Sequence, residues 1–213
     1  MKLNYYLKKI QILFFKKNFF YPKTIIDYFY CNKKMTVISF SSIGRGRKYV
    51  QQNEFFNLTK KYNFMFVKDI TRSWLNNVDI NYIKSFLKKN NNYAIGFSMG
   101  GFNAITFSNL YPVKKVIAFS PQFSIHPKIS NDNTFLNFAA SITEWKYKKL
   151  KFSNKTNYLI IFGDSEKEKY HMSMIPKRKN IKLMIIKNCD HNTASHLKKL
   201  NKLYKIINKF FLN

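Results

Sequence analysis

Apolar residues along the chain gather in short runs that are bounded by polar or turn residues, a pattern typical of β-strands. Asn32, Lys33 and Lys34 separate the first two runs and predict a hairpin turn between them. The predicted strands are residues 24–30, 35–40, 63–68, 93–97, 115–119, 158–162 and 181–187.

Beyond this hairpin, the strands alternate with stretches of helical pattern. They read as continuous apolar runs, so both faces of the sheet are expected to be covered. We find no internal repeat or long linker, and residues 1–213 are therefore expected to form one α/β domain. Its sheet should be mainly parallel, with an N-terminal antiparallel hairpin, helices on both faces and no large cap domain. The predicted helices are residues 48–62, 80–89, 99–110, 135–149 and 193–211.

The sequence from Gly96 to Gly100 reads G-x-S-x-G and lies between a predicted strand and a predicted helix. A serine at the apex of such a sharp turn is exposed above the sheet, and glycines on either side allow the strand and the helix to approach closely. Ser98 is thus the predicted nucleophile. The N–H of Met99, at the start of the helix, is a predicted donor to an oxyanion.

A serine hydroxyl needs a general base, and on this kind of turn an acid and then a histidine follow the serine in the chain. His191 follows the last predicted strand and precedes the last helix, which is the expected place for the base. His196 is the alternative, one turn into that helix. We interpret His126 and His171 as loop residues, although His126 is also a candidate for lining the pocket.

Acidic residues follow the strand at 158–162 within a few positions of one another. Asp164, just past the end of that strand, is the predicted partner that orients His191. Glu166 and Glu168 remain open as alternatives, because glutamate also serves in this position.

Loops after two other strands complete the predicted site. After residues 35–40, a backbone N–H of Ser41 or Ser42 is the predicted second oxyanion donor. The sequence Gly44-Arg45-Gly46 is not followed by the G-K-S/T residues that end a phosphate-binding loop, so this interpretation is weak. After residues 63–68, the side chains of Asp69, Arg72 and Trp74 are predicted to bind substrate, with the indole stacking on a sugar ring. We expect no metal site.

The formal net charge of the chain is +28, carried almost entirely by lysine. Phosphate and base recognition usually draws on arginine, and arginine is scarce here. The enrichment in Asn, Ile, Phe, Tyr and Lys also matches an A/T-rich coding bias. We therefore do not expect a nucleic-acid partner, and an anionic polysaccharide or membrane surface remains open.

The two cysteines, Cys31 and Cys189, are far apart and have no metal-ligand spacing, so both are expected to be free thiols. Residues 1–23 form a basic, aromatic segment in which lysine pairs interrupt each apolar run. This pattern favours neither a secretory signal nor a membrane span. It predicts a cytoplasmic protein with peripheral contact to the inner membrane as an option.

With the Gly96–Gly100 motif, Asp164 and His191 in this order, the chain resembles the α/β-hydrolase family from about residue 24 to the end. Residues 66–74 and 118–122 are similar to small hydrolase-like enzymes of bacterial surface-polysaccharide clusters, among them capsule O-acetyltransferases. The family's HG motif after the early strand is missing here.

This resemblance implies an acyl-enzyme on Ser98 and either an esterase or an acyltransferase, since the fold hosts both. The expected substrate is a glycan or a small ester. No cofactor is expected to be bound, and acetyl-CoA is a possible acyl donor. The alternative function is a catalytically silent protein that binds an anionic polymer or a membrane through its charge.

Overall fold

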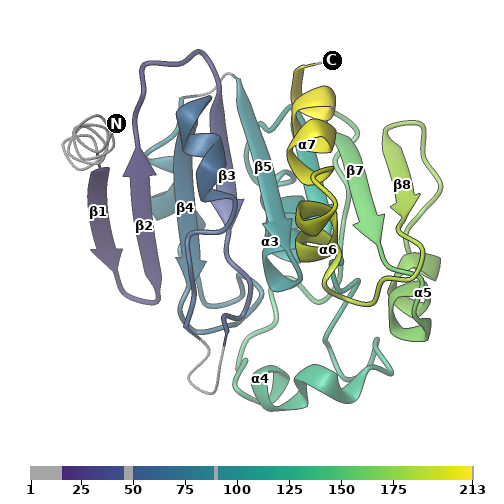
Figure 1. The fold of residues 1–213 in the computed structure, drawn as a ribbon. Coiled ribbons are helices and arrows are strands. Elements are labelled where there is room, and N and C mark those ends of the chain that lie inside the picture. The colour runs from purple at the N-terminus through teal and green to yellow at the C-terminus, as the bar shows by residue number, and fades with distance from the viewer. Residues whose placement is uncertain (1–15, 46–49, 89–90, 213) are drawn as a thin grey trace.

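The structure is a computed structural model that describes residues 16–45, 50–88 and 91–212. Its centre is an eight-stranded sheet in the order β1-β2-β4-β3-β5-β6-β7-β8 (Figure 1). All pairs from β4 to β8 are parallel, as predicted for a doubly covered sheet. The strands are β1 (Lys16–Tyr21), β2 (Thr24–Phe29), β3 (Thr36–Phe40), β4 (Asn63–Asp69), β5 (Asn92–Phe97), β6 (Lys115–Phe119), β7 (Asn157–Phe162) and β8 (Ile181–Ile185).

The sheet begins with an antiparallel hairpin, as predicted, but other strands form it. β1 pairs with β2 through a tight turn in which Lys23 has a φ of 72°. β2 then runs antiparallel to β4, so the residues at 32–34 cross to β3 instead of closing a hairpin. The side chain of Asn63 holds this crossing, because its Oδ1 accepts from the N–H groups of Cys31 and Lys33. Most of the basic segment 1–23 lies outside the described residues.

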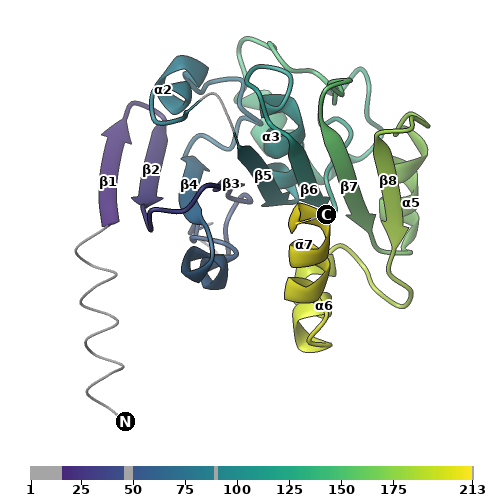
Figure 2. The ribbon, with the colours of Figure 1, turned by 90° about the horizontal axis from the view of Figure 1, so that it is seen from above.

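Helices cover both faces of the sheet, as Figure 2 shows from above. α2 and α3 lie on one face, and α6 and α7 lie on the other. All five predicted helices are shorter than expected or are divided. Residues 80–89 give α2, residues 99–110 give α3, and the described part of 48–62 gives η1. Residues 135–149 give the end of η2 and α4, and residues 193–211 are divided between α6 and α7. The helical elements are η1 (Phe56–Lys60), α2 (Ile80–Lys84), α3 (Met99–Phe107), η2 (Asn133–Phe135), α4 (Leu136–Ala140), α5 (Glu166–Ser173), α6 (Thr193–Lys199) and α7 (Leu203–Leu212).

Two apolar cores form because the central strands bury side chains on both faces. The first core packs α2 and α3 against the sheet, with Phe102 and Phe107 fully inside it. The second packs η1, α6 and α7 against the opposite face through Leu58, Leu197 and Ile207. Burial of this much apolar surface is the main force that fixes the strand ends in place.

The carboxyl ends of the parallel strands meet at one edge of the sheet, where sites in open α/β folds usually form. The chain between β6 and β7 makes a long excursion beyond this edge and carries η2 and α4 (Figure 1). Among the described residues, no helix has the length and apolar character that crossing a bilayer requires.

Candidate active site

Ser98 lies at the apex of the turn between β5 and α3. Its backbone has a φ of 56° and a ψ of −123°, a conformation that is costly for a residue with a side chain. The N–H of Ser98 donates to Phe119 O at 2.8 Å, and this bond anchors the turn to the end of β6. The residue is only 3% exposed. A strained serine held this way is typical of a nucleophile.

The glycines around Ser98 are required by the close contact of backbones. A Cβ on Gly96 would lie 2.1 Å from Gly100 O, and a Cβ on Gly100 would lie 2.0 Å from Phe40 O. Neither neighbour is a flexible side-chain end, so any larger residue would displace α3 from β5 or β3.

His191 lies beside Ser98, as its place in the chain predicts. Its Nε2 is 2.9 Å from Ser98 Oγ. The loop from β8 to α6 carries the imidazole to the carboxyl edge, and Phe97 packs next to the ring at 5.0 Å between centroids. The predicted nucleophile and the predicted base are therefore within hydrogen-bond distance of each other.

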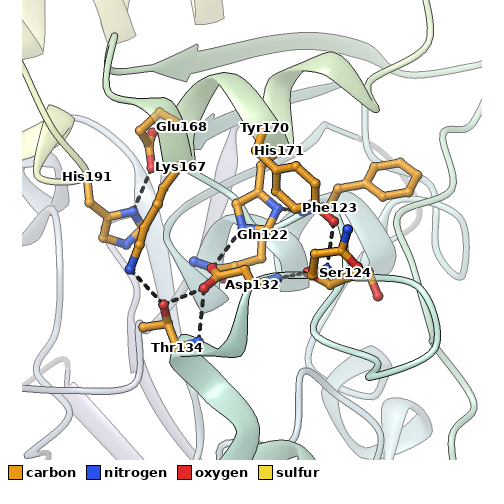
Figure 3. A network of polar contacts seen from close by, with 12 residues as sticks. Gln122, Phe123, Ser124, Asp132, Thr134, Lys167, Glu168, Tyr170, His171 and His191 are labelled. Atoms are coloured by element: carbon orange, nitrogen blue, oxygen red, sulfur yellow. Dashed lines mark hydrogen bonds and ion pairs between the residues drawn. The ribbon is translucent and has the colours of Figure 1, made fainter.

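The carboxylate beside His191 belongs to Glu168 and not to Asp164. Glu168 Oε1 is 2.8 Å from His191 Nδ1, and Figure 3 shows this contact reaching across from α5. The second oxygen, Oε2, accepts from Gly163 N–H at 3.2 Å. Because Nδ1–H donates to Glu168, Nε2 is the unprotonated nitrogen that faces Ser98.

Asp164 makes no hydrogen bond with His191, so the prediction of Asp164 as the partner of His191 was wrong. Its short side chain turns toward the loop after β8 and accepts from the N–H groups of Asn188 and Cys189. Glu166 is exposed and pairs with Lys169. Glu168 lies inside α5, where helical side chains point back toward the N-terminus and so toward the strand end.

The surroundings of Glu168 keep it ionised. Burial by itself raises the pKa of this carboxyl, but hydrogen bonds from His191, Ser120 and Gly163 N–H outweigh that effect. The pKa of Glu168 therefore lies below its ordinary value. A carboxylate that is charged at neutral pH stabilises an imidazolium next to it, which suits the role predicted for His191.

The two predicted oxyanion donors differ in their availability. Within the described residues, no hydrogen bond uses the amide N–H of Met99, which lies at the start of α3. The N–H of Ser42 donates to Glu54 Oε1 at 3.1 Å, and the N–H of Ser41 donates to Val67 O at 3.0 Å. Neither is free to face Ser98, so the prediction of Ser42 as second donor was wrong.

The carboxylate of Glu54 is buried beneath the Ser42 loop. Among the described residues its Oε2 has no hydrogen-bond partner. Burial raises the pKa of Glu54 to about 7, against the opposing effect of the bonds from Ser42. The folded chain thus holds this proton more tightly than the unfolded chain, whose glutamate pKa is about 4.3. This contribution to stability is complete below the unfolded pKa and is lost as the pH rises to about 7.

Replacing Glu54 with glutamine should therefore stabilise the protein only at high pH. We expect equal free energies of unfolding at an acidic pH, and a gain of about 3–4 kcal/mol for Glu54→Gln in alkaline buffer. Urea denaturation at both pH values measures the difference. Glu144→Gln, at an exposed position, is the matched control. An effect of Glu54→Gln that does not change with pH would contradict the assignment.

The loop after β4 is built differently from the prediction. Asp69 is 1% exposed, and its carboxylate accepts from the backbone N–H groups of Thr71, Ser73 and Leu75. Asp69 thereby holds a tight turn in which Arg72 and Trp74 have φ values of 50° and 51°. It is an organiser of the loop and is not available to a ligand.

The contacts of Arg72 and Trp74 also disagree with the predicted role in substrate binding. The guanidinium of Arg72 donates to Ile43 O and Ile70 O. Trp74 is fully buried between Phe135 and Phe138, so its indole cannot stack on a sugar. The apolar surface of Trp74 is large, so burying it against the excursion after β6 stabilises the fold more than leaving it exposed in the loop would.

A further residue at the site was not predicted. Gln122, in the excursion after β6, donates from Nε2 to Ser98 Oγ at 3.0 Å. In Figure 3 it is seen beside a buried pair formed by His171 and Asp132. His171 Nδ1 accepts from Phe123 N–H at 3.3 Å, and Nε2 is 3.1 Å from Asp132 Oδ2. The only sequence signal was the position of Gln122 just past a strand end.

Comparison with known proteins shows that the overall fold of this chain is a common one. No protein-family profile matches the sequence, and no curated protein matches it. Solved structures do match. The capsule O-acetyltransferase of Neisseria meningitidis serogroup A has a TM-score of 0.66 at 16% identity, over 92% of this chain and 94% of that one. A variant of the same enzyme in complex with CoA has a TM-score of 0.59 at 18% identity, over 88% and 94%.

A protein from another organism shares the architecture. An α/β hydrolase fold protein from Chitinophaga pinensis has a TM-score of 0.59 at 10% identity, over 93% of this chain and 97% of that one. The parallel sheet, the strained serine turn after β5 and these likenesses agree with one another. This chain therefore has the α/β-hydrolase fold.

Proposed function

We propose that the chain is a serine-dependent acyl-transfer enzyme in which Ser98, His191 and Glu168 act together. The observation that carries the proposal is the unbroken series of contacts from Glu168 through His191 to Ser98, with 2.8 Å and 2.9 Å between the bonded atoms. Because Ser98 also has the strained backbone of a nucleophile, a coincidental cluster of polar side chains is a poor explanation.

The chemistry follows from the protonation states. Ser98 Oγ attacks the carbonyl carbon of an acyl donor, and its proton passes to His191 Nε2. The tetrahedral intermediate places negative charge on the carbonyl oxygen, where the N–H of Met99 is available as a donor. As the bond to the leaving group breaks, His191 returns the proton to that group, and an acyl-Ser98 ester remains.

The second half of the reaction repeats these steps with an acceptor. His191 removes the proton of an incoming hydroxyl, whose oxygen attacks the acyl carbon. Collapse of the second intermediate returns a proton to Ser98 Oγ and releases the acylated acceptor. If the acceptor is water the enzyme is an esterase, and if it is a sugar hydroxyl the enzyme is an O-acyltransferase.

We favour an O-acetyltransferase that transfers the acetyl group of acetyl-CoA to a surface polysaccharide. The likeness to a capsule O-acetyltransferase, one form of which is in complex with CoA, supports this choice. A net charge of +28 also suits an anionic polymer as acceptor.

Release of free CoA from acetyl-CoA tests the proposal, measured with a thiol reagent and a panel of bacterial capsular polysaccharides. We expect release that depends on Ser98 and on one of these acceptors. Ser141→Ala, at an exposed position away from the site, is the matched serine control. Ser98-dependent hydrolysis of acetylated glycans without any CoA release would identify an esterase. The absence of both would favour the silent, polyanion-binding alternative.

A further inference from the structure

The side chain of Gln122 contacts Ser98, for which the second oxyanion donor has not yet been identified. It follows Ser120 and Pro121 at the carboxyl end of β6, and its side chain is 1% exposed. The Nε2 amide group is 3.0 Å from Ser98 Oγ. A polar side chain buried this completely needs fixed partners, and Gln122 has one on each end of its amide.

Trp74 fixes the direction in which this amide points. The two ends of a glutamine amide have similar shapes, and only the hydrogen bonds decide which end faces the serine. The indole N–H of Trp74 can only donate, and it is 3.2 Å from Gln122 Oε1. The oxygen is thus held by Trp74, and the N–H groups are directed toward Ser98.

The backbone next to Gln122 is fixed by a second set of contacts. Phe123 N–H donates to His171 Nδ1, so the proton of the neutral ring lies on Nε2 and faces Asp132. Burial lowers the pKa of His171, against the opposing effect of Asp132, which favours this neutral form. Figure 3 shows these groups packed between α5 and the excursion after β6.

We infer that the side-chain amide of Gln122 is the second oxyanion donor, a role that rests on the proposed function. The early loop that was predicted to supply this donor has both its amides engaged, at Ser41 and Ser42. When an acyl carbon bonds to Ser98 Oγ, its oxygen lies within reach of the Gln122 N–H. The amide then transfers its hydrogen bond from Oγ to that oxygen, to which the N–H of Met99 also donates. Trp74 is a positioning residue for this donor.

Kinetics with p-nitrophenyl acetate test the inference, because this small ester reports the acyl-transfer steps without a glycan. For Gln122→Ala we expect kcat to fall about 100-fold with KM little changed, the usual loss when one oxyanion donor is removed. A fluorophosphonate should still label the variant at one group per chain, although more slowly. Thermal unfolding shows whether the variant remains folded.

Gln122→Glu provides a readout that a structural role would not change. It keeps the shape of the side chain and the acceptor for Trp74 but replaces the donor with a carboxylate oxygen. Relative to the wild type, its activity should rise as the pH falls, because a protonated carboxyl can donate again. Trp74→Phe should lower kcat about 10-fold by releasing the amide, whereas the control Trp145→Phe should leave kcat unchanged.

Two results would overturn the inference. One is a folded Gln122→Ala enzyme whose kcat stays within threefold of the wild type. The other is a Gln122→Glu enzyme with the pH profile of the wild type. Failure of the proposed function itself looks different, because the wild type would then show no Ser98-dependent turnover and no labelling.

Discussion

Replacing Ser98 with alanine should abolish acyl transfer while leaving the fold intact. The variant loses the atom that forms the covalent intermediate, and we expect kcat to fall by about 10⁴–10⁶-fold, as in other enzymes with a serine–histidine pair. Since the backbone at Ser98 is strained, alanine there should not stabilise the turn. Turnover of p-nitrophenyl acetate and of acetyl-CoA measures the loss.

The covalent intermediate allows a more direct check. Mass spectrometry of the wild type after rapid quenching should detect one added acetyl group on the peptide that contains Ser98. Ser98→Ala should carry none, and Ser141→Ala should carry it as the wild type does. Acetyl transfer that persists in Ser98→Ala at more than a small fraction of the wild-type rate would refute the covalent mechanism.

Replacing Glu168 with glutamine should have the second largest effect. The substitution keeps the shape of the side chain but removes the charge that stabilises the imidazolium of His191. It also allows the amide to bond Nδ1 in the wrong tautomer. We expect kcat to fall by about 10³–10⁴-fold, the loss known for such a neutral replacement. Circular dichroism and thermal unfolding should remain close to those of the wild type.

Asp164→Asn is the matched control, because Asp164 lies between the end of β7 and the start of α5, close in the chain to Glu168. Its carboxylate accepts from two backbone N–H groups, so the amide should cost some thermal stability with only a small change in kcat. The opposite pattern would return the role to Asp164: an inactive Asp164→Asn beside an active Glu168→Gln.

Much of the fold could be predicted from the sequence because continuous apolar runs leave few arrangements open. The run at 115–119 coincides with β6, and the other predicted strands differ from the observed ones by a residue or two at their ends. The helices were less predictable. Aromatic and apolar residues in 135–149 pack against Trp74 and the sheet mostly from irregular chain, and Asn201, with a φ of 55°, interrupts the last helix.

The residues of the candidate site could be predicted where their order in the chain determines their position. They could not be predicted where local backbone geometry determines it. Ser98 and His191 come together because their strands end at one edge of the sheet. The choice among Asp164, Glu166 and Glu168 depends on which carboxyl the start of α5 directs toward His191, and no pattern in the sequence encodes that. The same holds for Ser42, whose N–H donates to a glutamate twelve residues away in the chain.

The stability of the proposed site depends on the edge of the sheet at which two of its residues lie. Glu168 and His191 follow β7 and β8, the last strands of the chain, and β8 forms the outer edge with Leu183 and Ile185 exposed. An edge strand of this kind opens more readily than the buried strands around it. Opening of this edge is therefore expected to separate the side chains of the proposed site while the central strands remain paired.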